Sequence, residues 1–240
     1  MFMNKKQKGF GNKVALITSL GFAIVLLTSL AIVAAWSDQE EVYPTYEDVK
    51  EEISVSAGDY KLDKQAYIGD PNAPVKVIEF IDYKCPYCKA WNTENFDDFK
   101  EKYIDTGKVQ FFVINFSFLG PDSLKAAMVG EILWKQNSEA FWEYEKAIYE
   151  NQGDKGTIWA NEKFLLDLIE KHVPHGDAAA VKKSLDNLEG LYEVKEDLAI
   201  TQANGVPSVP TFIVDSKQYT NPAISDLYEI IDSKLVKSQY

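Results

Sequence analysis

Residues 75–88 read VKVIEFIDYKCPYC, a β-branched apolar run that ends in two cysteines. The run Val75–Ile81 has the length and composition of a strand. Pro86 favours the start of a helix directly afterwards, because proline suits the first helical turn, where its missing N–H costs nothing. The stretch therefore predicts a strand that leads into a helix, with the thiols of Cys85 and Cys88 at the amino end of that helix.

Two cysteines at this spacing can close a small disulfide, and the free N–H groups at a helix amino end stabilise a neighbouring thiolate. We expect Cys85 to lie exposed at that end with a lowered pKa, and Cys88 to face inward on the same turn. We expect the charge of Lys84 to help Cys85 ionise, and the charge of Asp82 to cancel part of that help. The spacing and its context favour a redox-active pair.

Other interpretations of the pair fit the sequence less well. The chain holds two cysteines in all, which excludes a four-thiolate zinc site, and its two histidines lie far along the chain. A haem attachment signal needs His directly after the second cysteine, where this chain has Lys89. An inert structural disulfide stays open, although the small loop that it would close adds little stability.

The composition is that of a folded domain with an acidic surface. Of the 240 residues, 46% are hydrophobic and 26% are charged, as in ordinary globular proteins. Every basic residue is Lys, and the formal net charge is −12. Nucleic-acid binding is disfavoured, because it needs a basic face and usually uses Arg contacts to phosphate.

The charge is unevenly distributed along the chain. Residues 1–13 hold four Lys and no acid, residues 14–36 hold no charge, and the remainder holds 21 Lys against 37 acids. At about 1.5 Å per residue the uncharged segment spans roughly 34 Å, enough to cross a bilayer core of about 30 Å.

The basic head orients this segment with its amino end in the cytoplasm. We therefore expect a single-pass protein of the cell membrane, anchored through residues 14–36, with its main domain outside the cytoplasm. A cleaved signal peptide is the alternative, because Val33-Ala34-Ala35 offers small residues at a cleavage point. Either outcome exports the domain.

The rest of the chain predicts an α/β domain. Residues 37–65 are acidic and are expected to form a solvated linker with one short helix near Tyr46–Ile53. Within residues 66–240, the nearly all-apolar Val109–Phe116 predicts a buried central strand, and strand character returns at Val209–Val214. Amphipathic helices are predicted over Ser123–Lys135, Ser138–Glu150, Asn161–Val173, Asp177–Asn187, Leu191–Ala203 and Ile224–Val236.

Residues 77–88 resemble the first strand and active site of the DsbA-like group of thioredoxin-fold thiol–disulfide oxidoreductases. The likeness extends to Gly69–Val75 and Val109–Phe116, and Gly205–Phe212 resembles the cis-proline loop of the family. With its amino-terminal segment, the chain is similar to the membrane-anchored BdbD type of Gram-positive bacteria. The resemblance covers about residues 66–240. It implies an α/β thioredoxin fold with a helical insertion at about 120–204, preceded by a single transmembrane helix.

The resemblance implies roles for individual residues. Cys85 is implied as the nucleophile and Cys88 as the resolving thiol. Pro210 matches the cis-proline beside the disulfide, and Val209 before it is implied to present its backbone to an extended substrate. Glu79 matches the buried acid of the family, which relays a proton to or from Cys88.

Substrate contact is further expected at Pro86 and Tyr87, between the cysteines, and at Phe116, which begins an apolar groove with Phe118 and Leu119. Many DsbA proteins carry His where this chain has Tyr87, and Pro-Tyr is the pair of glutaredoxins. An extreme oxidising potential is therefore not assumed.

The implied activity is the oxidation of exported proteins that hold reduced cysteines, followed by reoxidation through a quinone-linked membrane oxidase. Beyond the Cys85–Cys88 disulfide no cofactor is needed, and no metal ligand is assigned. The resemblance also implies a structural calcium ion, whose ligands the sequence does not locate. A reducing, glutaredoxin-like exchange and a substrate-binding scaffold without redox turnover stay as alternatives.

Overall fold

The computed structural model describes residues 41–237, and Tyr43 and the residues after it belong to one compact unit. The segment 14–36, which the sequence predicts to cross a membrane, lies outside the described residues. Within residues 41–237, no helix is both long and apolar enough to span a bilayer.

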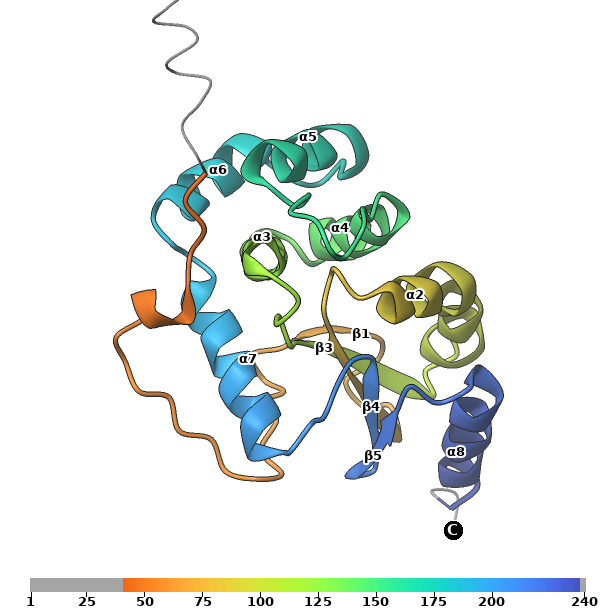
Figure 1. The fold of residues 1–240 in the computed structure, drawn as a ribbon. Helices are drawn as coiled ribbons and strands as arrows, with labels where there is room; N and C mark the ends of the chain where they lie inside the picture. The colour runs from red at the N-terminus through yellow and green to blue at the C-terminus, as the bar shows by residue number, and fades with distance from the viewer. Residues whose placement is uncertain (1–40, 238–240) are drawn as a thin grey trace, which may run out of the picture. The chain divides into compact units, whose positions relative to one another are not determined.

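A mixed sheet forms the centre of the domain, in the order β1-β3-β2-β4-β5 (Figure 1). Strands β2 and β3 pair in parallel, and the other pairs are antiparallel. Every residue of β3 is buried, which explains why five of its seven residues are apolar. The strands are β1 (Ala66–Ile68), β2 (Val75–Ile81), β3 (Val109–Asn115), β4 (Thr211–Val214) and β5 (Lys217–Thr220).

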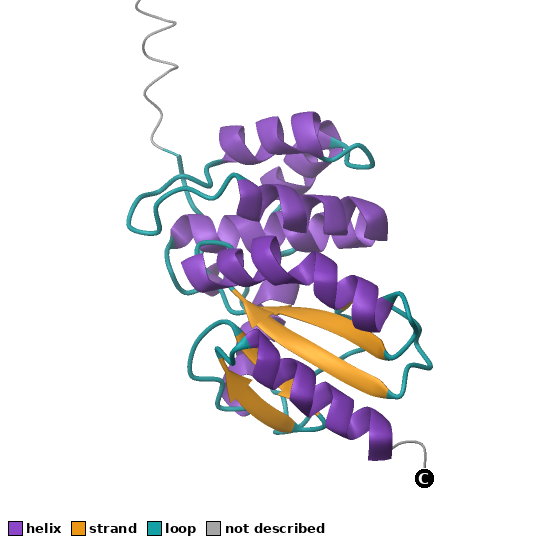
Figure 2. Cartoon of the chain, turned by 90° about the vertical axis from the view of Figure 1, so that its right-hand side faces the viewer, coloured by secondary structure: helices purple, strands orange, loops and turns teal. Residues whose placement is uncertain are grey.

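Helices cover both faces of this sheet. Helices α2 (Pro86–Phe99) and α8 (Ile224–Lys237) lie on one face, and α7 (Leu191–Ala203) lies on the other (Figures 1 and 2). Between β3 and α7 the chain forms a helical layer at one end of the sheet (Figure 2). This layer is the helical insertion, and it consists of α3 (Pro121–Gln136), α4 (Ser138–Glu150), α5 (Glu162–His172) and α6 (Ala178–Asp186).

Aromatic side chains fix α2 on the sheet. The ring of Trp91 lies 5.7 Å from that of Phe111 on β3 and 5.1 Å from that of Phe212 on β4, between centroids. In the strand register Val77 is beside Phe111, and Glu79 is beside Phe212, so all four side chains share the face under α2. Buried aromatic pairs contribute about 0.5–1.5 kcal/mol beyond their buried area. The cluster therefore holds the helix that carries the cysteines.

The predicted order of elements is confirmed, and a helical insertion is present. The predicted insertion of about 120–204 is too long, because its last helix, α7, packs on the sheet and the insertion ends with α6. Strand β2 and helices α4 and α7 have the predicted bounds, and the other predicted helices differ by one or two residues at their ends. Strands β1 and β5 were not predicted. Both are short edge strands, and β5 is mostly exposed, so neither has an apolar run that would mark it.

The prediction of a solvated linker over residues 37–65 is wrong for its described part. The hydroxyl of Tyr46 donates to the carbonyl of Ser117 at 2.9 Å, and the ring of Tyr60 lies 6.3 Å from that of Phe80. The expected short helix is a single 3₁₀ turn, Tyr46–Asp48. The segment is polar on average, but widely spaced apolar side chains anchor it to the domain. The side chains that pack against the core are Tyr46, Val49, Val55, Tyr60 and Leu62.

Two glycines with almost the same backbone conformation test the contact between α3 and α7. Gly190 (φ +85°) precedes α7, and a β-carbon there would lie 2.8 Å from the carbonyl oxygen of Met128. Gly58 (φ +84°) has nothing within 4 Å of that position. Alanine at either site incurs about 1–2 kcal/mol for the left-handed conformation.

We expect Gly190→Ala to lower the free energy of unfolding by at least about 1 kcal/mol more than Gly58→Ala, because only Gly190→Ala forces backbone apart. Urea denaturation of both variants measures the difference. Equal losses would contradict the close approach of α7 to α3.

Candidate active site

The cysteines lie at the junction of β2 and α2. Cys85 is the residue that caps α2, and Cys88 lies in its first turn. Cys88 is 1% exposed and faces inward as predicted. The predicted exposure of Cys85 is wrong, since it is 5% exposed. The reason is the carbonyl oxygen of Val209, which lies 3.5 Å from the Cys85 sulfur and covers it.

The two thiols differ in acidity. The pKa of Cys85 is lowered to about 7 by a hydrogen bond from the Cys88 thiol and, to a smaller extent, by the N–H groups of Cys88 and Tyr87, against the effect of burial. Burial raises the pKa of Cys88 well above its ordinary value, and the hydrogen bond to Cys85 and the charge of Glu79 add to this. Near neutral pH, Cys85 is therefore the reactive thiolate, and Cys88 keeps its proton.

The loop that precedes β4 lies across Cys85. Its Val209–Pro210 peptide bond is cis, and both residues are buried. The hydroxyl of Thr211 donates to the carbonyl of Ser208 at 2.7 Å and closes the turn. The structure thus brings Val209 and Pro210 to the cysteine pair, where the resemblance places them.

Lys84 binds the helical insertion instead of the cysteine. Its Nζ lies 2.6 Å from Oδ1 of Asp122 and 2.9 Å from the carbonyl oxygen of Thr157. Both charged side chains are buried. The expectation that Lys84 helps Cys85 ionise is therefore wrong, because a buried charge needs its partner close by, and here that partner is Asp122.

Asp82 connects the cysteine turn to the loop after β3. Its carboxylate accepts from the N–H of Lys84 at 2.8 Å, of Phe118 at 2.9 Å and of Leu119 at 3.0 Å, and from the hydroxyl of Ser123. Its charge slightly raises the pKa of Cys85, in the predicted direction.

Glu79 is 3% exposed, on the sheet face under α2. Burial raises its pKa well above the usual value, and the charges of Glu145 and Cys85 raise it further. The predicted burial of this strand acid is confirmed.

Sequence reasoning missed a second buried acid, Glu145 of α4. Its carboxylate accepts from the hydroxyl of Tyr83 at 2.7 Å, and burial raises its pKa to about 8. A sequence signal was available. Phe141, Tyr144 and Ile148 form one apolar stripe of α4 at the spacing of a helix face, and Glu145 is the charged residue within it.

Exposed apolar side chains lie on the cysteine turn and on the loop that is hydrogen-bonded to it. Pro86 is exposed, and Tyr87 is 62% exposed. The half-buried ring of Phe116 packs on that of Phe118 with centroids 4.6 Å apart, and Phe118 is 50% exposed. Because Asp82 holds the backbone of Phe118, this aromatic pair lies on a loop joined directly to the cysteine turn.

A second buried polar cluster joins β3, α3 and α7. Asp197 accepts from the backbone and side-chain amides of Asn115 at 2.9 and 3.0 Å, and from the amide of Gln65 at 3.0 Å. The Asn115 side chain also donates to Glu131 at 2.9 Å. Burial raises the pKa of both acids, that of Asp197 to about 7. Residues 41–237 contain no group of three or more His, Cys, Asp or Glu arranged for a metal ion.

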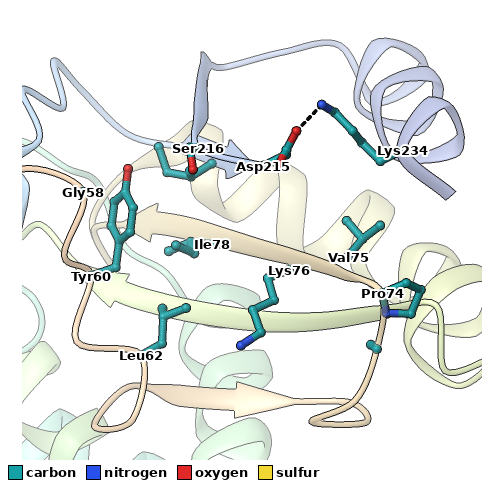
Figure 3. A pocket seen from close by; sticks show the side chains of 12 residues that line it. Gly58, Tyr60, Leu62, Pro74, Val75, Lys76, Ile78, Asp215, Ser216 and Lys234 are labelled. Atoms are coloured by element: carbon teal, nitrogen blue, oxygen red, sulfur yellow. Dashed lines mark hydrogen bonds and ion pairs between the residues drawn. The ribbon is translucent and has the colours of Figure 1, made fainter. Parts of the chain in front are cut away.

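A cavity of about 660 Å³ lies at the opposite end of β2 from the cysteines (Figure 3). Pro74 and Val75 at the start of β2 line it, and the ion pair between Lys234 and Asp215 closes one side. Neither cysteine nor Pro210 lines this cavity, so it is separate from the redox site.

Known proteins share this fold and site. The family model described as Thioredoxin matches residues 61–233. The probable disulfide bond formation protein D of Bacillus anthracis is 37% identical over 173 residues, which cover 72% of this chain and 79% of that protein. Disulfide bond formation protein D of Bacillus subtilis (strain 168) is 32% identical over 180 residues, covering 75% and 81%.

Solved structures of other proteins have the same fold as this chain. The crystal structure of oxidised BdbD from Bacillus subtilis matches with a TM-score of 0.70 and 29% identity, over 77% of this chain and 100% of that one. DsbA from Chlamydia trachomatis shares the fold, with a TM-score of 0.66 and 23% identity over 77% of this chain and 96% of that one.

The fold, the helical insertion and the paired cysteines define a DsbA-like protein of the thioredoxin class. Within that class the chain belongs to the disulfide bond formation protein D family of thiol–disulfide oxidoreductases. The family resemblance of residues 66–240 is thereby confirmed.

The difference between the two thiols can be measured on the reduced protein. We expect thiolate absorbance to rise with a midpoint near pH 7, because Cys85 ionises there. Cys88→Ala removes the hydrogen bond from the Cys88 thiol and raises this midpoint. Cys85→Ala, the matched control, abolishes the transition, because Cys88 ionises only at much higher pH. A transition near pH 7 in Cys85→Ala would contradict the assignment of the two thiols.

Proposed function

We propose that this protein introduces disulfide bonds into exported proteins, with Cys85 as the nucleophilic thiol. The observation that carries the proposal is the asymmetry of the pair. Cys85 has a lowered pKa and lies against the Val209 carbonyl, whereas Cys88 is buried and keeps its proton. A pair of this kind offers one sulfur to a substrate and holds the other in reserve.

The reaction begins with the oxidised pair. A substrate thiolate attacks the Cys85 sulfur, the Cys85–Cys88 bond breaks, and its electron pair goes to Cys88. A second substrate thiolate then attacks the substrate sulfur of the mixed disulfide, and Cys85 leaves as a stabilised thiolate. The substrate is oxidised by two electrons, and the cysteine pair is reduced.

Glu79 gives its proton to Cys88 when that sulfur leaves and takes the proton back on reoxidation. Its position supports this role, because it is buried under α2 and its charge acts on Cys88. Burial favours the protonated form of a carboxyl, and that form can donate a proton.

The substrate binds as an extended strand along Val209 and Pro210, beside Pro86 and Tyr87. Phe116, with its neighbour Phe118, contacts apolar side chains of the substrate. The support is geometric, since Tyr87 and Phe118 are both largely exposed next to buried cysteines. An unfolded protein offers such a surface both an extended backbone and apolar side chains.

The protein acts outside the cytoplasm, tethered through residues 14–36, and passes its electrons to a quinone-linked membrane oxidase. The uncharged length of that segment and the four Lys before it support the tether. Mass spectrometry of the mature protein tests it, since a chain beginning near Trp36 would show cleavage instead of anchoring.

A structural calcium ion fits the buried cluster of Asp197, Glu131, Asn115 and Gln65. The cluster combines two carboxylates with two side-chain amides, whose N–H groups donate to the carboxylates here; turned over, the amides would offer oxygens, the donor type that calcium prefers. A divalent cation there would balance two acids that burial otherwise penalises. The ion would tie α7 to α3 and β3, with no part in the thiol chemistry.

Calcium addition is therefore expected to raise the melting temperature of the protein, since an ion that binds only the folded state stabilises it. Asp197→Asn removes a ligand and abolishes the increase, whereas Asp186→Asn, on the exposed part of α6, keeps it. Thermal unfolding in 1 mM calcium measures the effect, since this concentration is about the dissociation constant of extracellular calcium sites. Unfolding in 1 mM magnesium gives the comparison. An increase that persists in Asp197→Asn would contradict this site.

The proposed function is tested by the oxidation of a reduced, unfolded test protein. We expect Cys85→Ser to abolish it, because no disulfide can form. Tyr87→Ala, which keeps both cysteines, is expected to slow it less than about tenfold by removing one exposed contact. Activity that survives Cys85→Ser would leave only a substrate-binding scaffold and overturn the proposal.

A further inference from the structure

Cys88 and Glu79 are both enclosed within the protein, at 1% and 3% exposure. In the proposed function, each reduction of the cysteine pair adds a proton to Cys88 and each reoxidation removes it. Glu79 can hold that proton for a short time but cannot exchange it directly with solvent. Another side chain has to connect this enclosed pair to water.

Glu145 lies where such a connection is needed. It lines a cavity of about 260 Å³ between α2 and α4, whose rim carries the exposed side chains of Asp97, Lys146 and Glu150. It also accepts a hydrogen bond from Tyr83, two residues before Cys85. Its charge is the strongest charge acting on Glu79. Glu145 is itself only 3% exposed, so its route to solvent is this cavity, and its charge acts on the active-site acid Glu79.

Tyr149 lies one helical turn beyond Glu145 on α4. Its hydroxyl is buried and has no hydrogen-bond partner among the described residues. Its ring lies 5.5 Å from that of Tyr83. Cys88, Glu145 and Glu79 all act electrostatically on this hydroxyl, with Cys88 the strongest of the three. A buried hydroxyl without a partner costs about 1–3 kcal/mol, so this group does not serve stability.

We propose that Glu145 and Tyr149 carry protons between the Glu79–Cys88 pair and the cavity between α2 and α4. The inference rests on the proposed oxidase function. When Cys88 leaves the disulfide, it takes a proton from Glu79. Glu79 then takes one from Glu145 when the unpartnered Tyr149 hydroxyl turns to hydrogen-bond both carboxyl groups, and Glu145 is reprotonated through the cavity. Neither Glu145 nor Tyr149 touches the substrate, and both act through Glu79.

Charged and titratable groups from every neighbouring element influence this route. The buried ones come from β2, the cysteine turn, α2 and the insertion, and those at the cavity rim come from α2 and α4. The groups are Glu79, Tyr83, Cys85, Cys88, Glu131, Tyr144 and Tyr149, and at the rim Asp97, Lys100, Glu143, Lys146 and Glu150.

The experiment follows the reduction of the oxidised full chain by dithiothreitol, a small thiol that does not depend on the substrate groove. Stopped-flow tryptophan fluorescence gives the reduction rate between pH 6 and 9. Each rate is divided by the fraction of dithiothreitol that is present as thiolate at that pH, which corrects for the ionisation of the reductant. In the unaltered protein we expect this corrected rate to fall above a pH of about 8, as Glu145 loses the proton that it donates.

In Glu145→Gln we expect the rate at pH 7 to decrease by about tenfold, less than the 10²–10⁴ typical of groups that act directly on a substrate, and the fall near pH 8 to disappear. Tyr149→Phe is expected to slow the reaction similarly, while the melting temperature stays the same or rises, because an unpaired hydroxyl is removed. Glu139→Gln, an exposed position on the same helix that does not line the cavity, is expected to leave rate and profile unchanged.

Two results would overturn the inference. One is an unaltered rate and pH profile in both Glu145→Gln and Tyr149→Phe. The other is a uniform slowing at every pH with the fall near pH 8 intact, which would indicate a purely structural role. Oxidation of the reduced test protein by the unaltered chain separates the two claims. If that oxidation fails, the proposed function fails; if it succeeds while either result holds, only the proton route fails.

Discussion

The position of the Cys85 sulfur is the constraint on which the rest of the site depends. It lies between the Cys88 thiol and the first N–H groups of α2, which favour its thiolate, and the carbonyl oxygen of Val209, 3.5 Å away. The first contact controls reactivity, and the second leaves little of the sulfur exposed. A substrate therefore has to approach along the Val209–Pro210 loop to reach it.

The fold brings these groups together from distant parts of the chain. Antiparallel pairing of β2 with β4 places the loop before β4 beside the turn after β2. Trp91 fixes α2 on the sheet, and the insertion holds the cysteine turn through Lys84 and Asp122. The side chain of Gln152, after α4, donates to the carbonyls of Tyr83 and Cys85 at 2.8 and 3.0 Å. The insertion is thus part of the active-site framework as well as a cover.

Much of the fold and the reacting pair could be predicted from local sequence. The apolar β2 and β3, the amphipathic helices and the cysteine spacing each carry a short-range signal. The packing of residues 43–65 could not be predicted in this way, because it depends on single apolar side chains whose partners are distant in sequence. The ion pair of Lys84 with Asp122 could not be predicted for the same reason, since the two residues are 38 positions apart and no local pattern connects them. The burial of Glu145 could be predicted from its place in the apolar stripe of α4, but its closeness to the active site could not, because that depends on the packing of α4 on α2.

The direction of electron flow is the central claim, and the equilibrium between the Cys85–Cys88 couple and glutathione tests it most directly. The stabilised Cys85 thiolate favours the reduced pair and so makes its disulfide an oxidant. We expect a reduction potential above about −230 mV, the lower end of the glutaredoxin range. A potential below that value, toward that of thioredoxin at about −270 mV, would make the protein a reductant and contradict the proposed oxidation of exported proteins.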